Sequence, residues 1–306
     1  MRLYSYSETI LQGYLETNPS FSSLIISENT PKQLIIARLL IGSLKINNHY
    51  RDFEFYQLKD TLEHFYTSSS FFPLERMKNY ISEELTVEDL ANFYNNPSSR
   101  RNSKFYSRLL DEFSNYFYYS QKNNFTTAFI YIYRILEVIS FAFPLIYAAQ
   151  TDDFKDTFGY LKQYFKGNQG SNQGELGFFK SFVVKTFESN PIASTSVDFD
   201  FSTIHIQNSK MILFRKIKEI CGDRILHPAT QDFDKLSVNF TDMGSFIITI
   251  RNRFFHLFNR GDNNIESEEI FDADALCEIL TERCIGWISL IYFEILKNSL
   301  LTIRNQ

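Results

Sequence analysis

The pattern of apolar and polar positions predicts a chain built mainly from helices. In the segment 243–260, MGSFIITIRNRFFHLFNR, apolar residues recur at helical spacing. The residues on that stripe are Met243, Ile247, Ile250, Phe254 and Leu257. The segments 105–120 and 125–149 carry aromatic residues on more than one face, and 276–296 is apolar nearly all round after Asp272, a suitable N-cap. These patterns predict an all-α fold, a helical bundle.

The first hundred residues also have the spacing of short and medium helices. Pro31 is placed to open a helix over 32–46, KQLIIARLLIGSLKI, and the segment 52–66 has an apolar side at helical spacing. Thr86 and Asp89 form a capping-box-like helix start, with Asp in place of the usual Glu. We therefore expect this region to be helical, and it contains no phosphate-binding glycine loop.

One polar segment divides the chain. Residues 95–103, NNPSSRRNS, contain no apolar residue and have the composition of a linker. The sequence therefore predicts a helical N-terminal region over 1–98 and a helical domain over 103–306. Within the second, residues 191–206 alternate polar and apolar side chains, which favours a short strand or an extended excursion.

Composition and charge narrow the choice of function. The chain of 306 residues has 32 Phe and 18 Tyr but only 11 Gly and 7 Pro, which agrees with a helical protein. Its formal net charge of −5 excludes a global basic field that would hold nucleic acid. Any attraction for RNA must be local, and two places offer it: the arginines of 251–260 and the cation-rich run 210–224. For the second run, a solvated helix face is the simpler and favoured interpretation.

Cysteine usage and hydropathy indicate a soluble protein in a reducing compartment. The three cysteines, Cys221, Cys277 and Cys284, are odd in number and form no Cys-x-x-Cys pair, which argues against a structural zinc site. Cys277 and Cys284 are expected to be small buried apolar residues. The N-terminus lacks the apolar core of a signal peptide, and charged residues interrupt the apolar segment 125–150. We expect a cytoplasmic protein with no membrane partner.

The candidate chemistry lies on the helix over 243–260. Asn252, His256 and Asn259 recur at helical spacing and form a polar line beside the apolar stripe, and Arg251 lies next to Asn252. An arginine can clamp phosphate oxygens in a fork, and a histidine can move protons near neutral pH. The simpler interpretation makes His256 a capping residue near the helix C-terminus and Arg251 a member of an ion pair.

The residues Arg251-Asn252-Arg253-Phe254-Phe255-His256 resemble the R-x4–6-H signature of the HEPN superfamily, in which a polar residue commonly follows the arginine. The resemblance covers 105–306 in general pattern and six residues in specific motif. It implies an HEPN-like helical C-terminal domain, a metal-independent endoribonuclease without cofactors, and a homodimer that pairs two copies of the motif. By the same resemblance, its setting is phage defence or a toxin-like effector, controlled by an antitoxin or an activator protein.

The expected reaction is attack of the ribose 2′-hydroxyl on the adjacent phosphorus, which leaves a 2′,3′-cyclic phosphate. His256 would serve as general base or acid, and Arg251 would hold the non-bridging oxygens. Asn252 would orient His256 or bind the phosphate, and Arg253 and Arg260 would contact the RNA substrate. A two-fold dimer would bring two copies of the site together. The alternative is a catalytically inactive, all-α dimeric binding or scaffold protein.

Overall fold

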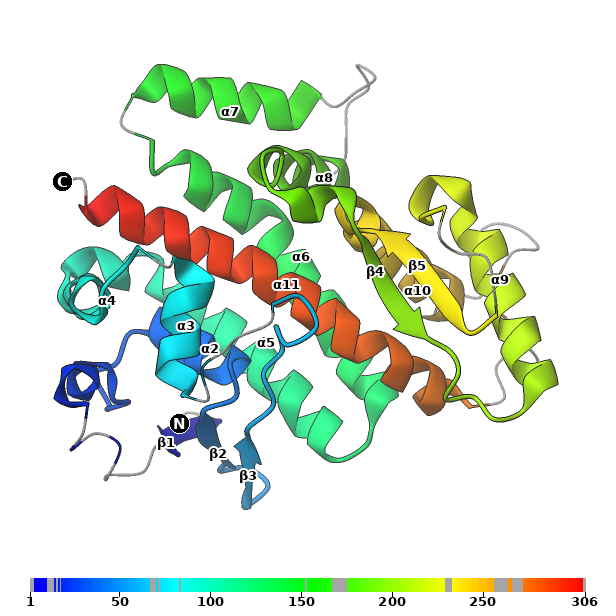
Figure 1. Ribbon diagram of the computed structural model, residues 1–306, viewed down its shortest axis with the longest axis horizontal. Helices are drawn as coiled ribbons and strands as arrows, with labels where there is room; N and C mark the ends of the chain where they lie inside the picture. The colour runs from blue at the N-terminus through cyan, green and yellow to red at the C-terminus, as the bar shows by residue number, and fades with distance from the viewer. Residues whose placement is uncertain are drawn as a thin grey trace. The chain divides into compact units, whose positions relative to one another are not determined.

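The computed structural model describes residues 3–9, 14, 16, 18–66, 70, 72–82, 84–151, 153–166, 175–228, 233–255, 264–265 and 272–304. The described chain is predominantly helical, as predicted, but it also contains two small antiparallel sheets (Figure 1). The expectation of an all-α chain was therefore wrong in this respect. Packing divides the chain into two compact units, which are described separately.

The first unit comprises Met1–Lys122 together with Gly286–Gln306, and the second comprises Asn123–Ile285. These units do not coincide with the ranges 1–98 and 103–306 predicted as domains. The difference arises because helix α5 (Ser103–Gln121) and the end of helix α11 (Ala273–Arg304) belong to the first unit. The polar segment predicted as a linker contains a 3₁₀ helix, η2 (Pro97–Arg100), inside that unit.

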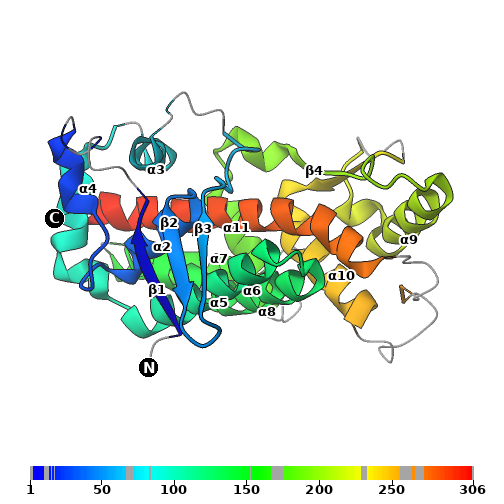
Figure 2. The same cartoon turned by 90° about the horizontal axis from the view of Figure 1, so that it is seen from below.

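A three-stranded sheet is the main departure from prediction in the first unit. Strands β1 (Tyr4–Glu8), β2 (Leu44–Asn48) and β3 (Phe53–Gln57) lie in the order β1-β2-β3, as Figure 2 shows. Every neighbouring pair is antiparallel, and Tyr6 pairs with Ile46, which pairs with Phe55. The predictions of helices reaching residue 46 and covering 52–66 were therefore wrong.

Gly42 explains why the first predicted helix stops early. Helix α2 covers only Lys32–Leu40, and Gly42 follows with a φ of +71°, a conformation that L side chains rarely adopt. A Cβ atom at this position would lie 2.4 Å from the carbonyl carbon of Leu58. After this turn the side chains alternate with period two, so that Leu44 and Ile46 are buried while Lys45 between them is not.

The other elements of the first unit agree better with the sequence. They are η1 (Pro19–Leu24), α3 (Pro73–Ile81) and α4 (Val87–Asn95). The capping box at the start of α4 is confirmed: the Asp89 backbone N–H donates to Thr86 Oγ1, and the Thr86 backbone N–H donates to the Asp89 carboxylate.

A buried ion pair connects four segments of this unit. The Arg38 side chain on α2 is fully buried, and its Nη1 and Nη2 donate to the two carboxylate oxygens of Glu8 at 3.0 and 2.7 Å. Its remaining donors reach the Leu24 carbonyl, the Ser43 carbonyl and Ser43 Oγ. All the hydrogen-bonding groups of this guanidinium are thus used to connect β1, η1, α2 and the turn before β2.

The second half of α11, from Gly286 onward, completes the core of the first unit. Tyr292 donates its hydroxyl to the Gln33 carbonyl at 2.7 Å, and Thr61 donates to Ser289 Oγ at 2.8 Å. A Cβ atom at Gly286 would lie 2.6 Å from the Thr61 carbonyl oxygen, so the helix backbone approaches this loop closely. The predicted burial of the long apolar helix is confirmed, and Asp272 caps it by accepting from the N–H groups of Asp274 and Ala275.

The second unit is a helical assembly with a two-stranded ribbon. Its helices are α6 (Phe125–Ala148), α7 (Phe154–Lys166), α8 (Glu175–Thr186), α9 (Gln207–Ile225), α10 (Met243–Phe255) and the start of α11, with 3₁₀ helices η3 (Pro191–Ser194) and η4 (Phe240–Asp242). Strands β4 (Ser196–Asp200) and β5 (Lys235–Asn239) are antiparallel, with Val197 opposite Val238. Strand β4 confirms the strand predicted within 191–206.

Helix α6 is long and apolar enough to be a candidate membrane span by length and composition alone, and 56% of its most apolar window is buried. Such burial also suits the core helix of a globular unit. Pro144 lies inside this helix without ending it.

We predict that replacing Glu8 with Ala lowers the free energy of unfolding by about 3–5 kcal/mol, because the Arg38 guanidinium is then buried without its counter-ion. Urea unfolding measures this change. Adding Arg38→Met should recover part of the loss, whereas Lys45→Ala, which breaks the exposed pair with Glu54, should cost less than about 1 kcal/mol. Equal losses from Glu8→Ala and Lys45→Ala would contradict this account.

The three cysteines should resist thiol reagents in the folded protein. All are buried, as predicted for Cys277 and Cys284, and burial raises the pKa of Cys221 and Cys277 to about 12 and that of Cys284 further. Because the folded pKa values lie above the ordinary 9.0, the folded chain retains these protons longer than the unfolded chain. Their contribution to stability is therefore lost as the pH rises above 9. Labelling at pH 8 with and without urea tests this, and rapid labelling of the folded protein would contradict it.

Candidate functional site

Helix α10 carries the motif residues Arg251, Asn252 and Arg253, and its apolar stripe fixes its orientation. Met243, Ile247 and Ile250 are almost completely buried, as predicted, and the helix packs against α6, α8 and α9 within the second unit. Phe254 is only half-buried, and Leu257 lies outside the described residues. Arg251 lies beside this stripe, next to Ile250, and both Arg251 and Asn252 are of intermediate exposure.

The Arg251 guanidinium is held from two sides. Its central carbon lies 4.3 Å from the centroid of the Tyr133 ring on α6. Its Nη1 donates to Asn252 Oδ1 at 2.9 Å. The sequence prediction that Arg251 and Asn252 share a surface is therefore confirmed, and the structure adds that Asn252 holds the arginine.

Two further contacts fix the end of α10. The Arg253 carbonyl accepts a hydrogen bond from the Ile265 backbone N–H at 3.0 Å. The Phe255 ring is parallel to that of Phe129 on α6, with centroids 6.5 Å apart. His256 and Arg260 lie outside the described residues, so their predicted roles as catalytic and substrate-binding residues stay predictions.

This arrangement gives the arginine a restricted geometry. An aromatic face contributes about 0.5–2 kcal/mol to a guanidinium placed over it. The bond from Nη1 to the amide also limits rotation of the fork. Because a guanidinium has five N–H donors, other donors remain that can bind two oxygens of a phosphodiester. The residues thus suit the binding of a phosphate group on the side of α10 that faces Tyr133.

Tyr133 is the residue that sequence analysis missed. It lies on another helix, 118 positions before Arg251 in the numbering, and no spacing rule joins the two. The only signal was its position in a helix with aromatic residues on several faces. Its neighbours Arg134 and Glu137 are exposed on α6, and the Arg134 guanidinium carbon lies 5.7 Å from the Tyr131 ring centroid.

The second cationic run mainly forms a helix surface, as the simpler interpretation held. Lys210 is buried and forms an ion pair with Asp234. Arg215 is exposed, with its guanidinium carbon 5.3 Å from the Phe233 ring centroid, and Arg224 is exposed near the end of α9. These cations are spread along the helix and do not converge on one point.

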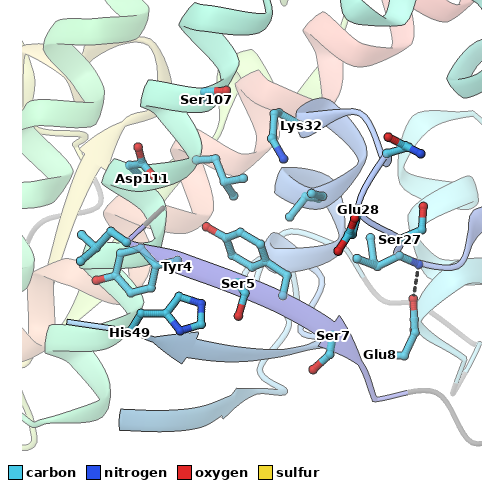
Figure 3. A pocket seen from close by; sticks show the side chains of 16 residues that line it. Tyr4, Ser5, Ser7, Glu8, Ser27, Glu28, Lys32, His49, Ser107 and Asp111 are labelled. Atoms are coloured by element: carbon cyan, nitrogen blue, oxygen red, sulfur yellow. Dashed lines mark hydrogen bonds between the residues drawn. The ribbon is translucent and has the colours of Figure 1, made fainter. Parts of the chain in front are cut away.

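A groove in the first unit is a separate candidate site. It has a volume of about 1260 Å³ and is lined by β1, the segment before α2, the start of α2, and α5. Figure 3 shows Tyr4 and His49 near one end of β1, Ser7 and Glu8 near the other, and Lys32 and Asp111 across the groove. Burial and the adjacent Glu112 raise the pKa of Asp111, while Lys32 opposes that rise.

Hydrogen bonds connect residues that line the groove to neighbouring segments. Tyr4 donates to Asn115 Oδ1 at 2.8 Å, and Glu8 accepts from both Arg38 and the Ile26 backbone N–H. Within the described ranges, no hydrogen bond or ion pair joins His49 to a carboxylate.

The chain matches no protein-family profile, no curated protein and no solved structure. The evidence for its function therefore consists of the residues and their geometry.

We predict that the Tyr133 ring shifts the Arg251 side-chain resonances upfield in the NMR spectrum. The cause is the ring current, because the guanidinium carbon lies 4.3 Å from the ring centroid. Tyr133→Leu should abolish the shift and Tyr133→Phe should keep it, with Arg215 as a reference that no variant affects. An Arg251 spectrum unchanged in Tyr133→Leu would contradict this geometry.

Proposed function

We propose that this chain is a metal-independent, HEPN-type endoribonuclease that cleaves RNA through attack of the 2′-hydroxyl on the adjacent phosphodiester. The observation that carries the proposal is the Arg251 guanidinium, which lies against the Tyr133 ring and is hydrogen-bonded to the Asn252 amide oxygen. Because this guanidinium is already ordered, it loses less conformational entropy when it binds the non-bridging oxygens in the transition state.

In this proposal each motif residue has one role. Arg251 binds the phosphate and offsets the negative charge that develops on it. His256, five residues after Arg251, transfers the proton of the 2′-hydroxyl or of the leaving 5′-oxygen. Asn252 acts chiefly as the residue that positions Arg251, which refines the expectation that it orients His256. Arg253 and Arg260 supply further charge for the RNA backbone.

The proposed enzyme needs no cofactor, because the attacking group belongs to the RNA and the proton transfers use an imidazole. It acts as a homodimer in the cytoplasm, with two copies of the motif forming a composite site. Its setting is phage defence or a toxin-like effector, with an antitoxin or activator protein as regulator. These assignments rest on the motif and its family resemblance.

A binding or scaffold protein without catalytic activity is the second candidate. The observation that favours it is the groove beside β1, whose volume of about 1260 Å³ lies at or above the range of ordinary ligand sites. In this case Arg251 and Tyr133 would only stabilise the packing of α10 on α6.

The decisive experiment is cleavage of a mixed RNA pool in EDTA by the full chain. We expect the wild type to leave 2′,3′-cyclic phosphate ends and His256→Ala to lose activity by about 10²–10⁴-fold, the usual contribution of a general acid or base. Arg251→Ala should lose a similar factor. Arg215→Ala removes an exposed arginine from the same unit and is the matched control, which should cut normally.

Equal cleavage by the wild type and His256→Ala would refute the proposed site. Absence of cleavage by a folded wild type, at low salt and across RNA classes, would favour the binding candidate instead.

A further inference from the structure

The polar segment predicted as a linker lines a small pocket in the first unit. The pocket has a volume of about 300 Å³, at the lower end of the range for ligand sites. Its lining residues come from two parts of the chain. One part is η2 with the first turns of α5, including Arg100 and Ser103, and the other is the segment that leads into α2, including Thr30 and Lys32. The predicted linker therefore forms part of a polar pocket.

Two helices begin at this pocket, and neither start has a side-chain cap. Helix α2 follows Pro31, whose ring has no acceptor, and helix α5 follows Asn102, whose side chain makes no capping hydrogen bond. Helix α4, by contrast, begins with a capping box. The first N–H groups of a helix lack partners within the helix, and the helix dipole adds partial positive charge at that end. Both starts therefore favour an anion.

The charged side chains around the pocket have the same preference. Among the described residues that line it, Lys32 and Arg100 are cationic, whereas Glu28 is acidic. Arg100 Nη2 donates to the Asn29 carbonyl at 3.3 Å, and a guanidinium has further N–H donors for a ligand. The local formal charge is thus positive, although the whole chain carries −5.

A buried amide at the pocket has an unpartnered atom. Gln33 lines the pocket and is only 6% exposed, and its side-chain oxygen has no hydrogen-bond partner. Burial raises the pKa of Tyr106, and a hydrogen bond from the Gln33 side chain opposes that rise. Turning the amide over would let its oxygen accept from the Tyr106 hydroxyl and leave its NH₂ group to donate to a ligand. Because buried polar groups are normally paired, this amide independently indicates a bound group.

We propose that this pocket binds a phosphate group, held by Arg100, Lys32 and the starts of α2 and α5. The forked donors of an arginine match two oxygens of a phosphate, and a lysine supplies a compact positive charge. The hydroxyl groups of Ser103 and Ser107 also line the pocket and can donate to the remaining oxygens.

The phosphate can be free or part of a small organic phosphate. The pocket shares Glu28, Lys32 and Ser107 with the groove beside β1, which Figure 3 shows. The remainder of an organic phosphate would therefore extend from the pocket into that groove. Because Glu28 and Asp111 line the groove, this remainder should carry no further negative charge.

This inference does not depend on the proposed ribonuclease chemistry, because it uses neither Arg251 nor His256. Loss of RNA cleavage in His256→Ala and loss of phosphate binding in an Arg100 variant are therefore separate results.

Calorimetric titration of the full chain at low ionic strength tests the proposal, with inorganic phosphate, adenosine 5′-monophosphate and adenosine as probes. We expect saturable binding of a phosphate-bearing probe and none of adenosine. Arg100→Ala should weaken binding by about 10–100-fold, the usual contribution of a hydrogen bond to a charged group. The matched control is Arg108→Ala, which removes an exposed arginine of α5 that does not line the pocket and should leave binding unchanged.

Ser103→Asp separates binding from folding. An acid in the first turn of α5 interacts favourably with the helix dipole but repels a phosphate. We therefore expect this variant to lose binding without a lower melting temperature.

Two results would overturn the proposal: no saturable binding of either phosphate-bearing probe, or unchanged binding in both Arg100→Ala and Ser103→Asp. Loss of binding in these variants with an intact Arg108→Ala control supports it. In that case, tighter binding of the nucleotide than of phosphate assigns the pocket to an organic phosphate, and equal binding assigns it to free phosphate.

Discussion

The first unit depends on one buried charge. Arg38 can remain ionised in the core only because Glu8 and two backbone carbonyls surround its guanidinium. These partners come from segments that are not adjacent in sequence, so forming the pair also fixes β1 against α2 and the turn into β2. The same ion pair fixes one side of the groove beside β1, because Glu8 both lines the groove and is the counter-ion of Arg38.

The sequence predicted elements whose signals are local. Helix α10, the cap at Asp272 and the capping box before α4 follow from spacing and side-chain chemistry within a few residues. The sequence predicts helix where strands β2 and β3 form a hairpin. Each strand has only five residues, which is too short for a period of two to be distinguished from helical spacing. Gly42 was the missed signal, since the backbone of Leu58 that requires it lies sixteen residues away.

In the candidate site, too, contacts between sequence neighbours could be predicted and contacts between distant residues could not. Arg251 and Asn252 are neighbours in sequence, so their shared surface could be predicted from the helix alone. The role of Tyr133 depends on how α6 packs against α10, and no pattern within either helix encodes that contact.

Helix α11 has a consequence for the order in which the chain can mature. Its first turns belong to the second unit, whereas Gly286 and the residues after it supply Ser289 and Tyr292 to the core of the first. During synthesis, the sheet of the first unit and its helices therefore keep part of their apolar surface exposed until α11 has been synthesised. The first unit is therefore completed only after the second has been synthesised, so a nascent chain interrupted before α11 would carry an unfinished core.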